Sequence, residues 1–315
     1  MAQDAGRFYE APRHGLLPLY EAKMVHQFDH RWASYEESKA GSAPVIRDLT
    51  DREKESASRF VRPRYWVDSA DVEERLEGRW ERDWLLGWRN ITDNKTVART
   101  VVASVVPWAG VGHKYSLLFT ERPARDSALL LANLNCFPLD FCARQKVGGV
   151  GLDYYLMKQF PILPPDSYSL AVSWQPDAYL RDWIAERVLE LSYTAWDLQP
   201  FAKDLGYDGP PFKWDVERRF EIRCELDAAY FHLYEIERDD VDYIMSTFPI
   251  VQRKDEAAHG TYRTRDRILQ IYDGMASADW VSELTPPPAD PRAAHPQLPR
   301  AVAPLGSEIE SQSRD

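Results

Sequence analysis

The stretch that decides the fold is residues 126–149, DSALLLANLNCFPLDFCARQKVGG. Asp126 is a helix-capping residue that precedes several leucines, and this order predicts a helix. Pro138 should interrupt that helix. Because proline is tolerated in the first turn of a helix, a second short helix is predicted from there to Lys146. The pair Gly148-Gly149 then ends the second helix.

Working outward, the residues before this stretch alternate between predicted helix and predicted strand. A charged helix is expected over 70–83, and runs rich in β-branched and aromatic residues predict strands at 84–88, 100–106 and 115–119. Closer to the N-terminus, a helical patch is expected around 20–35, followed by a small-residue linker at 40–44.

The residues after this stretch predict an extended segment followed mainly by helices. The prolines within 160–165 force an extended exit segment, and Asp177, Asp215 and Asp239 or Asp240 each precede a helix-like apolar pattern. Seven of the 22 prolines lie between Pro286 and Pro304, so the end of the chain is expected to be disordered. The predicted fold class is α+β, divided into an N-terminal helical and linker segment (1–60), a mixed α/β domain (61–168), a mainly helical domain (169–280) and a disordered Pro-rich tail (281–315).

Composition limits the function classes. The 44% apolar content supports packed cores, and no run reaches the roughly 18 apolar residues of a membrane span. We therefore expect no membrane partner. The N-terminus lacks an apolar signal core, and three cysteines cannot build a disulfide framework. A reduced, cytoplasmic location is expected.

Charge is unevenly distributed along the chain. The 315 residues carry 39 Lys+Arg and 50 Asp+Glu, a net charge of −11, which argues against a general nucleic-acid binder. Residues 84–165 nevertheless contain nine cationic and five acidic residues, a net of +4. This basic island could meet a polyanionic partner, or it could be an unevenly charged surface without a partner.

Several short motifs suggest chemistry only weakly. His26 and His30 have the i, i+4 spacing of a zinc pair on a helix, but no third ligand follows. Glu21-Ala22-Lys23 has nuclease-like spacing without its acidic partner. Residues 209–212, Gly-Pro-Pro-Phe, lack the acceptor side chain of an adenine-methyltransferase turn, so a plain turn is favoured. No glycine-rich cofactor loop is visible. We expect no catalytic residue and no metal site.

Three longer stretches resemble one family. Residues 19–31, residues 131–165 (with LANLN, Asp140, ARQKVGG and KQFPILPP) and residues 201–251 (with FAKDLGY and TFPIV) resemble, in order, the region that follows the catalytic domain in fused, type IIG-like restriction–modification adenine methyltransferases. The middle stretch is similar to the signature of their target-recognition domain. Two residues depart from that signature: Cys136 stands where Ser is usual, and Pro138 lies in a helical stretch.

The resemblance implies a DNA target-recognition module for an adenine-specific methyltransferase of a restriction–modification or phage-defence system. Its partners would be double-stranded DNA and a methyltransferase catalytic domain or subunit. S-adenosylmethionine is expected on that separate or missing catalytic domain, because this chain lacks the motifs that would hold it. The alternatives are a self-sufficient methyltransferase or nuclease, and a helical docking subunit that does not contact DNA.

The DNA contacts are predicted within the basic island. Arg144 and Lys146 are expected to meet phosphates, with Arg99 and Lys114 as further DNA-binding cations. Gly148 and Gly149 would let the backbone approach the DNA without a Cβ in the way, although glycines that only end a helix explain them equally well.

Overall fold

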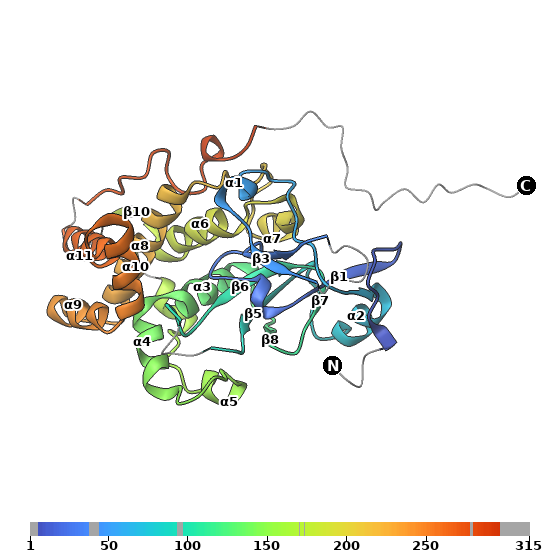
Figure 1. Cartoon of the computed structure of the whole chain (residues 1–315). Helices are drawn as coiled ribbons and strands as arrows, with labels where there is room; N and C mark the ends of the chain where they lie inside the picture. Colours follow the sequence, from blue (N-terminus) through green and yellow to red (C-terminus); the bar gives the residue numbers. More distant parts are fainter. Residues whose placement is uncertain are drawn as a thin grey trace, which may run out of the picture.

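The computed structural model describes residues 6–37, 44–92, 97–169, 171–172, 174–277 and 280–296. The fold is α+β, as predicted (Figure 1). The strands are β1 (Leu16–Tyr20), β2 (Ala33–Tyr35), β3 (Ile46–Asp48), β4 (Trp66–Asp68), β5 (Trp84–Arg89), β6 (Ala103–Pro107), β7 (Gly110–Val111), β8 (Tyr115–Leu118), β9 (Ala171–Val172) and β10 (Gln175–Tyr179).

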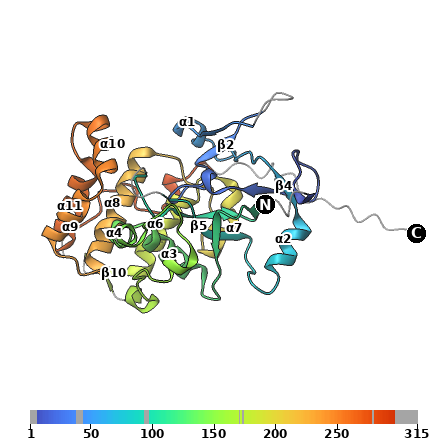
Figure 2. The same ribbon diagram turned by 60° about the horizontal axis from the view of Figure 1, so that its bottom comes forward.

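The helices are concentrated in the second half of the chain. They are α1 (Asp51–Lys54), α2 (Ser69–Leu76), α3 (Ala124–Asn135), α4 (Phe137–Lys146), α5 (Tyr154–Met157), α6 (Leu180–Ser192), α7 (Gln199–Asp204), α8 (Val216–Leu233), α9 (Arg238–Ser246), α10 (Pro249–His259) and α11 (Arg263–Met275). Figure 2 shows α9–α11 at one end of the molecule and α2 at the other. No helix in the described ranges is long and apolar enough to cross a membrane.

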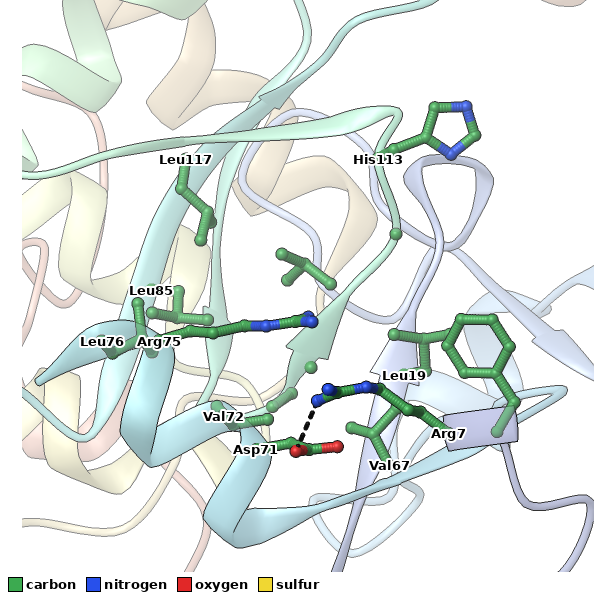
Figure 3. A pocket seen from close by; sticks show the side chains of 15 residues that line it. Arg7, Leu19, Val67, Asp71, Val72, Arg75, Leu76, Leu85, His113 and Leu117 are labelled. Atoms are coloured by element: carbon green, nitrogen blue, oxygen red, sulfur yellow. Dashed lines mark hydrogen bonds and ion pairs between the residues drawn. The ribbon is translucent and has the colours of Figure 1, made fainter. Parts of the chain in front are cut away.

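Two three-stranded sheets and the antiparallel pair β2-β3 form the strand-rich part. The order β6-β5-β8 is antiparallel, with Leu86 of β5 opposite Val105 on one side and Leu118 on the other. In the second sheet, β1 pairs antiparallel with β4 and parallel with β7. Trp84 and Leu85 are neighbours in β5 and therefore point to opposite faces of the strand. Both are fully buried, so both faces of this central strand lie in the core. A cavity of about 280 Å³ lies between the second sheet and α2 (Figure 3).

The helix pair predicted around Pro138 is present. Cys136 has an extended backbone (φ −77°, ψ 155°) and is both the C-cap of α3 and the N-cap of α4, with Pro138 in the first turn of α4. Helix α3 packs on α6, and α4 packs on α8. The buried core therefore continues across residue 168, where we placed a domain boundary.

The predicted helix around 20–35 is wrong. This segment forms β1, a short 3₁₀ turn and β2. Reciprocal backbone hydrogen bonds between His26 and Asp29 (2.8 and 3.0 Å) close a tight turn, and Phe28 takes a left-handed conformation (φ 57°). Nearly every side chain of 24–35 is buried. An amphipathic surface helix would expose one of its faces, so the segment forms a turn and short strands instead of a helix. The expected linker at 40–44 lies largely outside the described residues.

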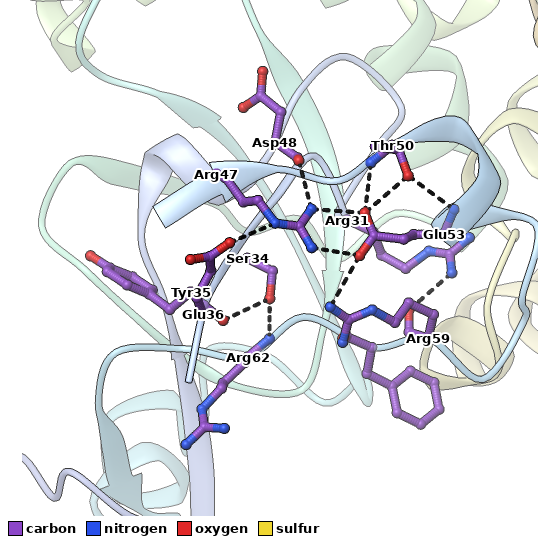
Figure 4. A network of polar contacts seen from close by, with 11 residues as sticks. Arg31, Ser34, Tyr35, Glu36, Arg47, Asp48, Thr50, Glu53, Arg59 and Arg62 are labelled. Atoms are coloured by element: carbon purple, nitrogen blue, oxygen red, sulfur yellow. Dashed lines mark hydrogen bonds and ion pairs between the residues drawn. The ribbon is translucent and has the colours of Figure 1, made fainter. Parts of the chain in front are cut away.

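Two polar layers attach this N-terminal segment to the rest of the molecule (Figure 4). On the surface, both terminal nitrogens of Arg47 donate to Glu53 (2.7 Å each), and Glu53 also accepts from the Thr50 backbone at the start of α1. Beneath it, the fully buried Arg31 donates to the carbonyls of residues 54, 56, 59 and 194, at 2.8–3.0 Å. Arg31 therefore ties the N-terminal segment to the helical region.

The chain after residue 165 departs from the prediction in two places. Strands β9 and β10 form a hairpin before α6, where only helices were expected. Residues 281–296, expected to be disordered, instead pack along the helical region: Lys213 N donates to Ala293 O (3.0 Å), and His295 N donates to Pro211 O (2.8 Å). Proline-rich chain is ordered here because its remaining backbone groups find partners. Residues 297–315, the rest of the predicted tail, lie outside the described residues.

Candidate nucleic-acid interface

The structure separates the basic island into a buried and an exposed part. Arg99 belongs to the buried part: its side chain is 9% exposed, and its Nε donates to Asp140 at 2.7 Å. The guanidinium also lies 3.8 Å from the centre of the Phe137 ring. This buried ion pair gives Arg99 a structural role, and its predicted contact with DNA stays a prediction that the placement does not favour.

Arg144 is half-buried and also bonds to other parts of the fold. It extends from the last turn of α4 and donates to the carbonyls of Val97 (3.2 Å), Ala98 (3.0 Å) and Thr247 (3.4 Å). The guanidinium lies 4.3 Å from the Phe248 ring centre, and burial lowers its pKa. Two chain segments distant in sequence fold over this cation. Arg144 therefore connects α4 with those segments, and its predicted phosphate contact stays a prediction that these bonds do not favour.

The signature residues beside these arginines form a buried clamp. Asn135 pairs with both backbone groups of Ala103 (3.0 Å each), which attaches the end of α3 to the edge strand β6. Asn133 accepts from Leu163 N (2.9 Å) and donates to the Tyr234 hydroxyl (2.8 Å). The resemblance in this region therefore rests largely on residues that hold the two halves of the molecule together.

Asp140 completes the clamp from α4. It is fully buried and accepts from the backbone N–H groups of Thr100 (2.9 Å) and Val101 (3.2 Å) as well as from Arg99. A buried carboxylate that accepts several hydrogen bonds and one ion pair is a fixed structural element. It positions the 97–103 segment, not a ligand.

The exposed part of the island contains three lysines near α5. It also contains Arg122 and Arg125, which lie at the start of α3 and pair with Asp126 and Asp182. Lys146, Lys114 and Lys158 are all exposed. Lys146 Nζ lies 3.4 Å from the Gln159 side-chain oxygen, and Lys114 lies in the turn between β7 and β8. Lys95, another cation of the island, lies outside the described residues. The predicted roles of Lys146 and Lys114 thus stay compatible with their placement.

Lys146 and Lys158 belong to a segment that we call the α5 lobe, residues 146–160. This lobe extends below α4 in Figure 1. The lobe is firmly attached. Trp88 Nε1 donates to Leu152 O (2.8 Å), Thr92 N donates to Val150 O (3.0 Å), and Asn90 Nδ2 donates to Asp153 (2.7 Å). Asn90 N in turn donates to Lys114 O (2.8 Å), so Lys114 lies beside the lobe.

Two tyrosines of the lobe were not predicted from the sequence as site residues. Tyr154 is 50% exposed and Tyr155 is 64% exposed. Tyr154 is fixed by a hydrogen bond from its hydroxyl to Leu117 O (2.9 Å) and by edge contact with Trp88 at 4.8 Å. Together with the three lysines they form the lysine–tyrosine surface: Lys114, Lys146, Tyr154, Tyr155 and Lys158. The two adjacent tyrosines shortly before Lys158 were the available signal.

The predicted glycine pair lies at the edge of this surface. A Cβ built on Gly148 or Gly149 meets no atom within 4 Å, and neither residue has a positive φ. The fold therefore tolerates a side chain at both positions. Any requirement for glycine here would come from a partner.

The weaker motifs have structural roles. His26 packs against Trp32 at 4.4 Å, and burial lowers its pKa to about 3, while His30 Nε2 lies 2.9 Å from Asp197. In the described part of the chain, no three His, Cys, Asp or Glu residues are grouped so that they could hold a metal ion. Phe212 of the Gly-Pro-Pro-Phe turn is fully buried beside Tyr207, so it is not presented to a flipped base.

Comparisons with protein-family models, with curated proteins and with solved structures gave no match for this chain.

Proposed function

We propose that this protein is the DNA target-recognition part of an adenine-specific methyltransferase of a restriction–modification or phage-defence system. The observation that carries the proposal is the lysine–tyrosine surface, in which three exposed lysines and two exposed tyrosines lie on and beside one well-anchored lobe. The sequence resemblance over 19–251 supports the same function. Double-stranded DNA would be bound in the cytoplasm.

The chemistry of the surface suits DNA. The three lysines outweigh the one acidic residue of the lobe, Asp153, and an ammonium on a flexible stem can meet phosphates of varied position. Tyrosine side chains supply rigid contact area at low entropic cost and can hydrogen-bond through the hydroxyl. Phosphate contacts would fix the register, and the tyrosines and the open backbone at 148–149 would approach the groove.

Methyl transfer would require a partner. We assign no residue of this chain to S-adenosylmethionine, which a methyltransferase catalytic domain or subunit would hold. The buried clamp formed by Asn133, Asn135 and Asp140 would keep the α5 lobe in a fixed orientation relative to the helical region. A module that reads bases for a separate catalytic centre needs this rigidity, because its contacts must be held in a fixed geometry relative to that centre.

The test measures DNA binding by the full chain. Fluorescence anisotropy of a labelled mixed-sequence duplex is followed over a salt series for the wild type and for Lys114→Gln/Lys146→Gln/Lys158→Gln. If each lysine neutralises one phosphate, the slope of log K against log salt should fall in magnitude by about 2–3. The matched control is Lys203→Gln/Lys213→Gln/Lys254→Gln, which removes the same charge from exposed lysines on other elements and should leave the slope unchanged.

Selection from a random duplex pool then tests sequence reading. Enrichment of one short motif by the wild type, lost in the Tyr154→Ala/Tyr155→Ala variant, is expected for a recognition module. If the triple lysine variant and its control behave alike, the surface does not bind phosphates. If the folded wild type shows no salt-dependent binding at all, the proposal is overturned in favour of the docking subunit.

A further inference from the structure

The cavity between α2 and the β4-β1-β7 sheet is lined by none of the five residues of the lysine–tyrosine surface, although His113 and Leu117 of its lining adjoin that surface. Its volume is about 280 Å³, a little below the roughly 300–1,000 Å³ typical of pockets for drug-sized ligands. The floor is apolar and comes from several elements: Leu19 of β1, Val67 of β4, Leu76 of α2 and Leu85 of β5. Its size and lining fit a small molecule with an apolar body.

The rim of the cavity carries the charge. Arg7 and Arg75 extend over it from opposite sides, whereas His113 points away from it (Figure 3). Arg7 donates to Asp71 at 2.7 Å, and both side chains of this pair remain partly exposed, at 50% and 29%. Two guanidinium groups and one carboxylate leave a net charge of +1 among the residues that line the cavity, if His113 is neutral.

We propose that this cavity binds a small organic monoanion with an apolar body, such as a medium-chain carboxylate. The apolar part would displace water from Leu19, Val67 and Leu85, and the anionic head would lie at the rim beside the guanidinium of Arg75. A guanidinium presents a planar pair of donors that matches a carboxylate. A neutral or cationic analogue would lose that contact, and a cation would also be repelled.

The inference is independent of DNA binding. The cavity is lined by the N-terminal residues, α2 and the segment 109–113, together with Leu117 of β8. The α5 lobe touches β8 through Tyr154, but no lobe residue lines the cavity. Failure of one proposal therefore leaves the other standing.

The test is isothermal titration calorimetry of the full chain with sodium octanoate, octan-1-ol and octylammonium chloride. Octanoate should bind one to one, at least about fivefold more tightly than octanol, which is the effect of one partly exposed charged contact. Octylammonium should bind most weakly. Absence of octanoate binding to the folded protein, or equal affinity for octanoate and octanol, would overturn the proposal.

Two substitutions with opposite expected signs separate recognition from misfolding. Arg75→Gln should weaken octanoate binding about fivefold or more, whereas Asp71→Asn removes the opposing charge at the rim and should tighten it. Arg79→Gln, the same change at an exposed arginine that does not line the cavity, should have no effect. Thermal unfolding checks that each variant is folded. If Arg75→Gln and Arg79→Gln change the affinity equally, or if Asp71→Asn weakens binding, the site does not recognise an anion through its rim.

Discussion

Arg144 and Lys146 are two residues apart at the end of one helix, yet they belong to different regions. Arg144 is covered by the 97–98 segment and by Thr247 and Phe248, while Lys146 is exposed at the start of the α5 lobe. The same division separates Arg99, paired with the buried Asp140, and the half-buried Arg144 from the exposed Lys114, Lys146 and Lys158. Positive charge in a sequence therefore does not by itself indicate a binding surface.

The side-chain chemistry explains the division. A guanidinium has five donors in a fixed plane, so a single arginine can satisfy several carbonyls and a carboxylate at once inside a protein. An ammonium is a strongly hydrated point charge and is costly to bury. Arg99, Arg144 and the three lysines near α5 follow this chemistry. Lys54, which is buried against Asp29, and the exposed Arg122 do not, so the contrast applies to these positions and not to the whole molecule. The following predictions test this contrast, from the largest expected effect to the smallest.

The largest effect is expected at Asp140. Asp140→Ala leaves Arg99 as a buried charge without its carboxylate and removes the acceptor for two backbone N–H groups. The free energy of unfolding should fall by about 3–5 kcal/mol, measured by urea denaturation. Asp153→Ala is the control, because it removes an exposed carboxylate in the lobe and should cost less than about 1.5 kcal/mol. Similar losses in both variants would contradict the division into a buried clamp and an exposed surface.

A pH effect is expected at Asp227 on the buried side. Burial is the main cause that raises the pKa of this carboxyl to about 6, while its oxygen accepts from Phe137 N at 2.8 Å. A raised pKa means that the protonated form is favoured in the folded state, so this contribution to stability is present below about pH 4 and is lost as pH rises through 6. Asp227→Asn keeps a side-chain oxygen that can accept from Phe137 N, and it removes the carboxyl group that titrates.

The stability of Asp227→Asn relative to the wild type should therefore increase between pH 4 and 8, by up to about 3 kcal/mol for a shift of about two pKa units. Denaturant unfolding at several pH values gives the difference. Asp153→Asn, at an exposed position, is the matched control. A difference that stays constant with pH would show that the neighbouring arginines hold Asp227 ionised throughout.

A third contrast is between Gly87, which is packed inside the sheet, and the open pair Gly148 and Gly149. Gly87→Ala in β5 should lose about 1–3 kcal/mol, because the new Cβ would run into the carbonyl oxygen of Ser116 and lie 2.7 Å from the Tyr115 ring. Gly148→Ala and Gly149→Ala should change stability by less than about 1 kcal/mol, since that space is open. Under the proposed function the latter two should still weaken DNA binding. Unchanged affinity in both would mean that the pair only follows the end of α4.

The smallest effect on folding is expected at Tyr155. Tyr154→Ala loses a hydrogen bond to Leu117 O and the contact with Trp88, which should cost about 1–2 kcal/mol. Tyr155→Ala should leave stability within about 0.5 kcal/mol while weakening DNA binding about fivefold or more. Parallel measurements of unfolding and anisotropy check this. If Tyr155→Ala is destabilising but does not alter DNA binding, the residue is a packing residue.

Local sequence pattern was sufficient to predict many of the helices and strands. The Asp215 cap and apolar spacing place α8, where the carboxylate accepts from Arg218 N at 3.0 Å, and the β-branched run places β6. The interruption at Pro138 follows from the missing N–H and the fixed φ of proline. In contrast, the turn at 26–29 depends on contacts with distant residues, so its apolar spacing predicted the wrong element.

The candidate site was predicted only in part for the same reason. The sequence by itself determined that a basic island exists, that a helix ends near Lys146 and that an open glycine pair follows. Only the tertiary structure decided that Arg99 and Arg144 bond to other parts of the fold, that Lys114 lies beside the lobe and that Tyr154 and Tyr155 are exposed. Secondary structure follows from neighbours within a few residues, whereas the exposure of a charge depends on chain segments that fold over it from far along the sequence.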